Sequence, residues 1–103
     1  MAVAHHIYGA VNNKTDMIKV FRAIRGQVGE AASRPALTEL YRRAGYLITL
    51  THAPSWEEKF GREAAALRRL GEEEFGKTAR KINRRARLVG TDPDYDETWG
   101  PGR

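Results

Sequence analysis

The strongest functional signal in this sequence is a run of cationic side chains near the C-terminal end, which could bind an anionic partner. Residues 77–90 carry six Lys and Arg side chains and no acidic one. On a helix, five of these cations fall within a band about 120° wide, which could neutralise several phosphate groups of a nucleic acid. The expected binding residues for nucleic acid or another anionic partner are Lys77, Arg80, Lys81, Arg84 and Arg87.

The same cationic run has a purely structural explanation. Lys and Arg near the C-terminus of a helix are stabilised by the helix macrodipole, and four acidic residues between positions 92 and 97 follow closely enough to neutralise them. No aromatic residue is interleaved with the cations for stacking on bases, and no helix-turn-helix, RRM, KH or zinc-finger pattern is present. Nucleic-acid binding is therefore the alternative function and not the first one.

Residues of the types used in catalysis are few and poorly spaced. His5 and His6 are adjacent and His52 is distant, so no pair has the i, i+4 spacing of metal-binding histidines on a helix. The two serines, Ser33 and Ser55, are better explained as helix caps than as nucleophiles. The expectation is a protein that is not an enzyme and that holds no metal and no cofactor.

Cysteine and glycine usage excludes further classes of site. The chain has no cysteine, which removes disulfides, Cys-ligated zinc, iron–sulfur clusters and thiol nucleophiles. Its glycines form neither of the two common phosphate-loop patterns. The acidic run Glu72, Glu73 and Glu74 is expected to form a solvated surface.

Length and hydropathy set further limits. A chain of 103 residues with 41% hydrophobic and 30% charged residues predicts a single domain with a modest core. No apolar run approaches the roughly 20 residues needed to cross a bilayer. The first residues lack the basic stretch followed by an apolar one that a signal peptide has. A cytoplasmic protein with no membrane contact is expected.

The candidate residues are expected to lie on helices. Apolar residues recur at helical spacing along most of the chain, which predicts an all-α fold. The expected architecture is a small bundle in which two shorter helices pack, roughly antiparallel, on one long C-terminal helix. Its segments are an N-terminal arm at 1–13, helices at 14–32, 33–53 and 55–89, and a tail at 90–103. The core is expected to draw on Val20, Phe21, Ile24, Val28, Leu37, Leu40, Leu47, Phe60, Leu67, Phe75 and Ile82.

Local signals place the helix ends. Thr15 is expected to cap the first helix and Ser33 the second. Residues 46–51 have strand propensity, but their apolar residues continue the helical period, so a helix is preferred. Ser55, followed three residues later by Glu58, has the capping-box spacing expected at the start of the long helix.

The long helix presents an apolar seam with small residues at heptad intervals. Ala64, Gly71 and Thr78 alternate with large side chains, an arrangement that lets a neighbouring backbone approach closely. Because two shorter helices would leave part of the long one uncovered, a homodimer is expected. If Gly71 and Gly76 break the segment, at about 1 kcal/mol each relative to Ala, two shorter helices result instead. The expected interface residues on this seam are Leu67, Gly71, Phe75, Thr78 and Ile82.

The tail combines acidic and aromatic residues. Tyr95 and Trp99 stand among acidic side chains and could anchor the tail to its own bundle, to a second subunit or to another protein. The first functional hypothesis is therefore a non-enzymatic interaction or regulatory protein that acts through the long-helix seam and this tail. The alternative is a small nucleic-acid-binding protein that acts through the cations at 77–90.

Overall fold

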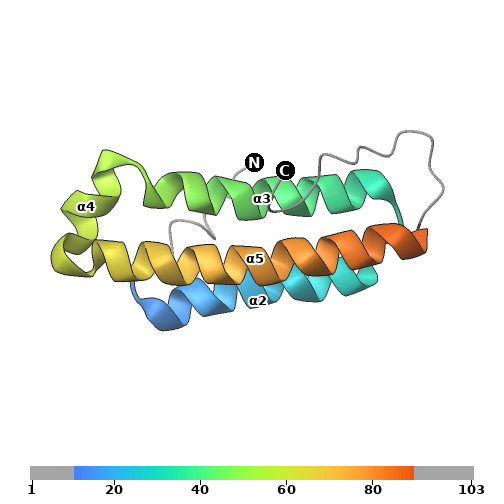
Figure 1. Cartoon of the computed structure of the whole chain (residues 1–103), viewed down its shortest axis with the longest axis horizontal. Helices are drawn as coiled ribbons and strands as arrows, with labels where there is room; N and C mark the ends of the chain where they lie inside the picture. Colours follow the sequence, from blue (N-terminus) through green and yellow to red (C-terminus); the bar gives the residue numbers. More distant parts are fainter. Residues whose placement is uncertain (1–10, 90–103) are drawn as a thin grey trace.

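Three long helices dominate the part of the chain that the structure describes, residues 11–89 of a computed structural model. They are α2 (Lys14–Glu30), α3 (Arg34–Thr51) and α5 (Ala64–Val89), and the short α4 (Pro54–Phe60) and the 3-10 turn η1 (Gly61–Glu63) connect the last two. Nine-tenths of these residues are helical, and none of them lies in a strand. The predicted all-α bundle of two shorter helices and one long helix is confirmed (Figure 1).

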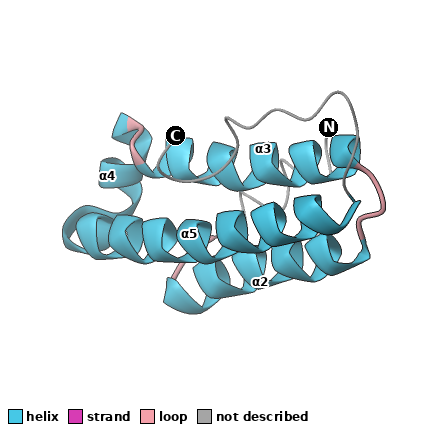
Figure 2. Ribbon diagram, turned by 45° about the vertical axis from the view of Figure 1, so that its right-hand side comes forward, coloured by secondary structure: helices cyan, strands magenta, loops and turns pink. Residues whose placement is uncertain are grey.

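The three long helices alternate in direction, because consecutive helices are joined by short connections. In the first half of α5, a methyl group placed on Gly71 would lie 3.3 Å from Cε of Met17, near the start of α2. Towards the end of α5, Arg85 Nε donates a hydrogen bond to the Ala31 carbonyl, just past the end of α2, at 2.9 Å. Therefore α2 runs parallel to α5 and α3 runs against both (Figure 1, Figure 2). The expected antiparallel packing of both shorter helices on the long one is wrong for α2.

The start of α2 is set by Asn13 and not by Thr15, the predicted cap. Asn13 has an extended backbone, and its side-chain oxygen accepts a hydrogen bond from the Asp16 backbone N–H at 2.8 Å. Asn ranks above Thr as an N-cap residue, and Asn13 stands where the extended segment enters the helix. At the other end the helix stops at Glu30, two residues before the predicted boundary.

The start of α3 has the predicted capping chemistry. Ser33 is extended, and its Oγ accepts a hydrogen bond from the Ala36 N–H at 3.3 Å, while Pro35 lies in the first turn. Residues 46–51, whose side-chain types allowed a strand, are helical because their apolar members continue the buried stripe. The helix ends at Thr51, two residues before the expected end.

The predicted continuous helix at 55–89 is wrong, because the chain breaks at Gly61. Ala53 occupies the N-cap position without a side-chain hydrogen bond and α4 begins at Pro54, so Ser55 is not the cap. Gly61 ends α4 with φ of 55° and ψ of −121°, a conformation that residues with a Cβ rarely adopt. The chain turns there, and η1 leads it into α5 (Figure 1).

From Ala64 onward the long helix is continuous, and neither Gly71 nor Gly76 interrupts it. Gly71 has a packing role. A Cβ on this residue would lie 3.3 Å from a Met17 atom on α2 and 3.6 Å from an Ile48 atom on α3. The missing side chain therefore lets both neighbouring helices come close to α5, and the alternative of a break at these glycines is wrong.

Gly61→Ala is expected to destabilise the protein by about 1–3 kcal/mol, because alanine must hold a backbone conformation that favours glycine. A Cβ at Gly61 meets no atom within 4 Å, so the effect comes from the backbone and not from a clash. Urea unfolding of the wild type and the variant measures it. The matched control is Gly45→Ala, a helical glycine with equally open surroundings, which should be neutral or stabilising. An equal loss in both variants would contradict the explanation.

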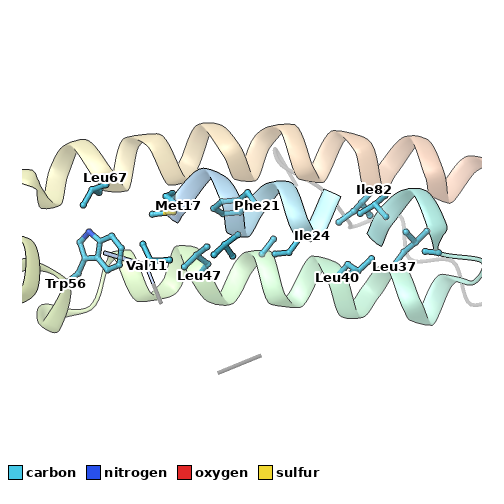
Figure 3. Close-up of a cluster of buried hydrophobic side chains, with 14 of the residues drawn as sticks. Val11, Met17, Phe21, Ile24, Leu37, Leu40, Leu47, Trp56, Leu67 and Ile82 are labelled. Carbon is cyan, nitrogen blue, oxygen red and sulfur yellow. The ribbon is translucent and has the colours of Figure 1, made fainter. Parts of the chain in front are cut away.

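The hydrophobic core lies between the three long helices. In Figure 3, Met17, Phe21 and Ile24 of α2 point into the layer between α3 and α5. The predicted core residues are buried, except Phe60 and Phe75, which are only partly buried at its edge. The core is thus assembled from all three helices within one chain.

Trp56, which was not predicted as a core residue, closes one end of the bundle. Its side chain is buried and its Nε1 donates a hydrogen bond to the carbonyl of Ala64, the first residue of α5, at 3.2 Å. Its ring also packs on Phe60, with 4.4 Å between ring centroids. The short helix α4 therefore fixes the point at which α5 begins.

Candidate nucleic-acid interface

The apolar seam of α5 faces the chain's own helices. Leu67, Gly71, Thr78 and Ile82 are buried within the single chain, and Phe75 is half-buried with its ring 5.6 Å from that of Tyr41 on α3. Because α2 and α3 both lie along α5, they cover the face that was expected to need a second copy. Within the single chain, four of the predicted interface residues on this helix are therefore core residues, and Phe75 lies at the edge of the core. Their role as an interface between copies stays a prediction. Tyr95 and Trp99 lie outside the described residues.

Little apolar surface is exposed along residues 11–89. The exposed large apolar side chains in this range are Tyr46 on α3, which is 39% exposed, and Leu88 near the end of α5, which is 77% exposed. They stand on different helices and form no contiguous patch of the kind that marks a protein interface. The homodimer stays a prediction, and its expected surface on α5 is already covered.

Two arginines of α5 satisfy the ends of the other helices. Arg68 Nε donates to the carbonyl of Thr51, the last residue of α3, at 2.7 Å, and Arg85 Nε donates to the Ala31 carbonyl after α2. Neither α2 nor α3 has a basic residue in its own last turn, where carbonyl groups lack helical partners. These two cations are therefore used in holding the bundle together, and Arg85 does not belong to a binding surface.

Glu74 is buried, whereas a solvated position was predicted for it. Only 4% of the residue is exposed, because it faces α2. Its Oε1 lies 2.8 Å from Arg25 NH1 and its Oε2 lies 3.2 Å from Lys77 Nζ. Burial raises the pKa of the Glu74 carboxyl, but hydrogen bonds and charges from Arg25 and Lys77 outweigh it and bring the pKa below the usual 4.5. The carboxylate therefore stays ionised and joins α2 to α5.

Glu74→Gln is expected to lower the free energy of unfolding by about 1–3 kcal/mol at neutral pH, because it leaves a partly buried guanidinium without its counter-charge. The folded-state pKa lies below the unfolded one, so the wild-type advantage is present above 4.5 and shrinks as pH falls through the folded pKa. Urea unfolding of both proteins from neutral to acid pH measures this difference. A gap that stays constant with pH would contradict the assignment.

The cations that remain form an exposed row on α5. Arg80, Arg84 and Arg87 are exposed, and half-buried Lys81 lies over α2, with its Nζ 3.9 Å from the place where a Cβ of Gly29 would stand. Within residues 11–89 none of these four cations forms an ion pair. Lys77 continues the row, with 56% of its side chain exposed, although Glu74 partly neutralises it.

The dimensions of this row fit a phosphate backbone. At a rise of 1.5 Å per residue the span from Lys77 to Arg87 is about 15 Å, which corresponds to about four phosphates of one strand at 3.4 Å each. No acidic and no aromatic residue lies between positions 76 and 89. The row therefore offers charge to phosphates and no ring for stacking on bases. These five residues, Lys77, Arg80, Lys81, Arg84 and Arg87, are called the α5 basic row below.

The histidines do not build a metal centre in the part described. His52 is the C-cap residue of α3, and its Nε2 lies 3.4 Å from Glu72 Oε2 at the surface. Between residues 11 and 89 no three His, Asp or Glu side chains gather as metal ligands. His5 and His6 lie outside that range.

Two exposed cations of α2 lie outside the predicted site. Lys19 and Arg22 are exposed on the helix that packs beside α5. Their sequence positions show only that they avoid the apolar stripe of their own helix. Which neighbour they face depends on how the helices pack.

Hydropathy and similarity give no further guide to function. None of the helices between residues 11 and 89 combines the length and the apolar character needed to cross a bilayer. Comparisons of the chain with protein-family models, with curated proteins and with solved structures found no match.

Proposed function

We propose that this protein binds nucleic acid through the α5 basic row, by contacts to backbone phosphates. The observation that carries the proposal is the row of four cations without an ion-pair partner in the described residues, Arg80, Lys81, Arg84 and Arg87, on a helix segment with no acidic residue. A line of cations without ion pairs among the described residues can bind a polyanion. Each phosphate that such a cation neutralises releases condensed counterions, and this release favours binding.

The packing of α5 also favours this function over the interaction role predicted first. That role needed the apolar seam, whose members Leu67 and Ile82 are enclosed by α2 and α3. Its second element, the tail with Tyr95 and Trp99, remains a prediction. The basic row, in contrast, is on the outer side of the same helix, where Arg80, Arg84 and Arg87 are exposed among the described residues.

The contacts available to the row are electrostatic, which defines the type of recognition. Lys and Arg side chains that reach phosphates position a protein on nucleic acid without reading its sequence. With no aromatic residue between positions 76 and 89, stacking on single-stranded bases has no platform there. The proposal is therefore binding of weak sequence preference and strong salt dependence.

The test is fluorescence anisotropy of labelled duplex DNA, duplex RNA and single strands with the full chain at increasing salt. Four phosphate contacts predict that log K falls with log salt at a slope of about −3.6 for duplex DNA. A polyglutamate peptide of matched charge is the control, because an acidic protein partner would be mimicked by it. Absence of binding at about 50 mM salt, or equal affinity for polyglutamate, would overturn the proposal.

A further inference from the structure

The cations of the α5 basic row do not all point the same way around the helix. Lys77 Nζ lies 3.2 Å from Oε2 of Glu74, the buried residue that faces α2. Lys81 Nζ also lies on the side of α2, 3.9 Å from the place where a Cβ of Gly29 would stand. These two cations therefore form one edge of the row, beside α2.

The other edge of the row turns towards the side of α3. Arg80 NH1 lies 3.4 Å from the place where a Cβ of Gly76 would stand. Gly76 comes one helical turn after Glu72, whose Oε2 lies 3.4 Å from His52 Nε2 at the end of α3. Arg87 comes two turns after Arg80 and so lies on the same side of the helix. Arg80 and Arg87 therefore form the second edge.

Between these two edges α5 presents an exposed ridge. Figure 1 shows α5 between α2 and α3, which run along its two sides. Arg84, which lies between the two edges, is exposed. At 100° per residue the five cations of the row cover an arc of about 120°. The ridge can therefore meet phosphates on both of its sides at once.

The acidic residues nearest to the row are buried, turned away or beyond its end. Glu74 is buried beneath Lys77. Glu30 of α2 and Glu39 of α3 line a hollow between those two helices, away from the ridge of α5. Glu73 precedes the row by one turn and limits it at that end. A polyanion on the ridge beside residues 77–87 thus meets cations on both edges.

The width of the ridge suits the major groove of B-form DNA. A helix with its side chains is about 10–12 Å across, and the major groove is about 12 Å wide and admits one helix. A helix in this groove has one phosphate strand on each side, so each edge of the row can meet its own strand. The major groove of duplex RNA is deep and narrow, and a single strand offers only one line of phosphates.

We propose that the C-terminal half of α5 binds in the major groove of duplex DNA. Lys77 and Lys81 are directed to the phosphates of one strand, and Arg80 and Arg87 to those of the other. This inference rests on the proposed function and names duplex DNA as the ligand.

The first experiment compares duplex DNA and duplex RNA of the same sequence as ligands of the full wild-type chain. Affinity for the DNA is expected to be roughly tenfold higher or more, because α5 cannot enter the RNA groove. DNA whose cytosines carry bulky glucosyl groups in the major groove should bind roughly tenfold more weakly than plain DNA. Netropsin, which fills the minor groove, is the control ligand and should change the affinity less than about threefold.

The second experiment tests the two edges with single variants. Lys81→Gln and Arg87→Gln should each lower the affinity for duplex DNA by roughly three- to tenfold and the salt slope by about 1. The matched control Arg62→Gln removes the same charge from an exposed residue of η1 and should leave the slope nearly unchanged. Thermal melting checks that each variant is folded.

The outcomes separate this inference from the proposed function. Equal affinity for the DNA and RNA duplexes, or unchanged binding of the glucosylated DNA, would overturn the placement in the major groove alone. An effect in only one of the Lys81 and Arg87 variants would overturn the two-edge arrangement. Failure of the wild type to bind any nucleic acid would overturn both proposals.

Discussion

The triple variant Lys81→Ala/Arg84→Ala/Arg87→Ala is expected to bind duplex nucleic acid on the order of 100-fold more weakly than the wild type at near-physiological salt. The variant removes three of the four cations of the row that have no ion pair within residues 11–89. Each phosphate contact contributes up to roughly tenfold at about 0.1 M salt. The salt slope should fall by about 3. Because Ala is the best helix former and two of the three replaced side chains are exposed, the fold should persist.

A variant of equal charge makes this prediction specific. Arg42→Ala/Arg62→Ala/Arg69→Ala removes three exposed cations outside the row and should change duplex affinity only modestly. Anisotropy titrations of both triple variants, with circular dichroism as the check on folding, are the measurements. If the two variants lose affinity equally, net charge and not the row attracts the ligand, and the proposed site is wrong.

Ile82→Asn is expected to unfold the chain or to lower its free energy of unfolding by about 3–5 kcal/mol. Ile82 is 0% exposed between α2 and α3, so the substitution removes a buried aliphatic group and buries an amide without partners. The whole stability of a small domain is about 5–15 kcal/mol, so a loss of this size is readily measured by thermal and urea unfolding.

The same variant distinguishes the two uses of the α5 seam. If the seam were an interface between copies, Ile82→Asn would leave a folded monomer and halve the apparent mass in sedimentation. The control Leu88→Asn lies on the same helix at a residue that is 77% exposed and should leave stability nearly unchanged. A folded, stable Ile82→Asn protein of reduced mass would contradict the intrachain core.

Much of the helical architecture was predictable because its causes are local. The apolar stripe of α3 and its Ser33 cap depend on residues within a few positions of one another, and both appear in the structure as predicted. The errors at helix starts have the same local origin. Thr15 and Ser55 are good cap residues, but Asn13 is a better one for α2, and Pro54 begins α4 without a side-chain cap.

The break at Gly61 was harder to predict, since a glycine inside a helical pattern is compatible with either outcome. The periodicity from Phe60 to Val89 runs across it without a gap. Trp56 helps to decide the matter, because its indole packs into the end of the core and hydrogen-bonds to Ala64. A tertiary contact thus accompanies a turn where the local pattern favoured a continuous helix.

Only part of the candidate site could likewise be predicted from the sequence. The cations from Lys77 to Arg87 could be placed on the outer side of a helix from spacing alone. Spacing could not show that Glu74 is buried against Arg25, or that Lys77 is thereby partly neutralised. Nor could it bring Arg85 to the Ala31 carbonyl after α2, because no pattern in a sequence states which helix lies beside which.

The helical class, the polarity of each helix face and the cationic character of the last helix could all be predicted, because they follow from residue types at fixed spacing along one chain. The packing of the helices shows that α2 and α3 cover the seam around Ile82, that Arg25 and Lys77 neutralise Glu74, and that α2 lies parallel to α5. The reason is that the sequence shows that an apolar face needs a packing partner and that a buried charge needs a counter-charge, but it does not identify either one. Which residues provide them is settled by how the three helices pack together.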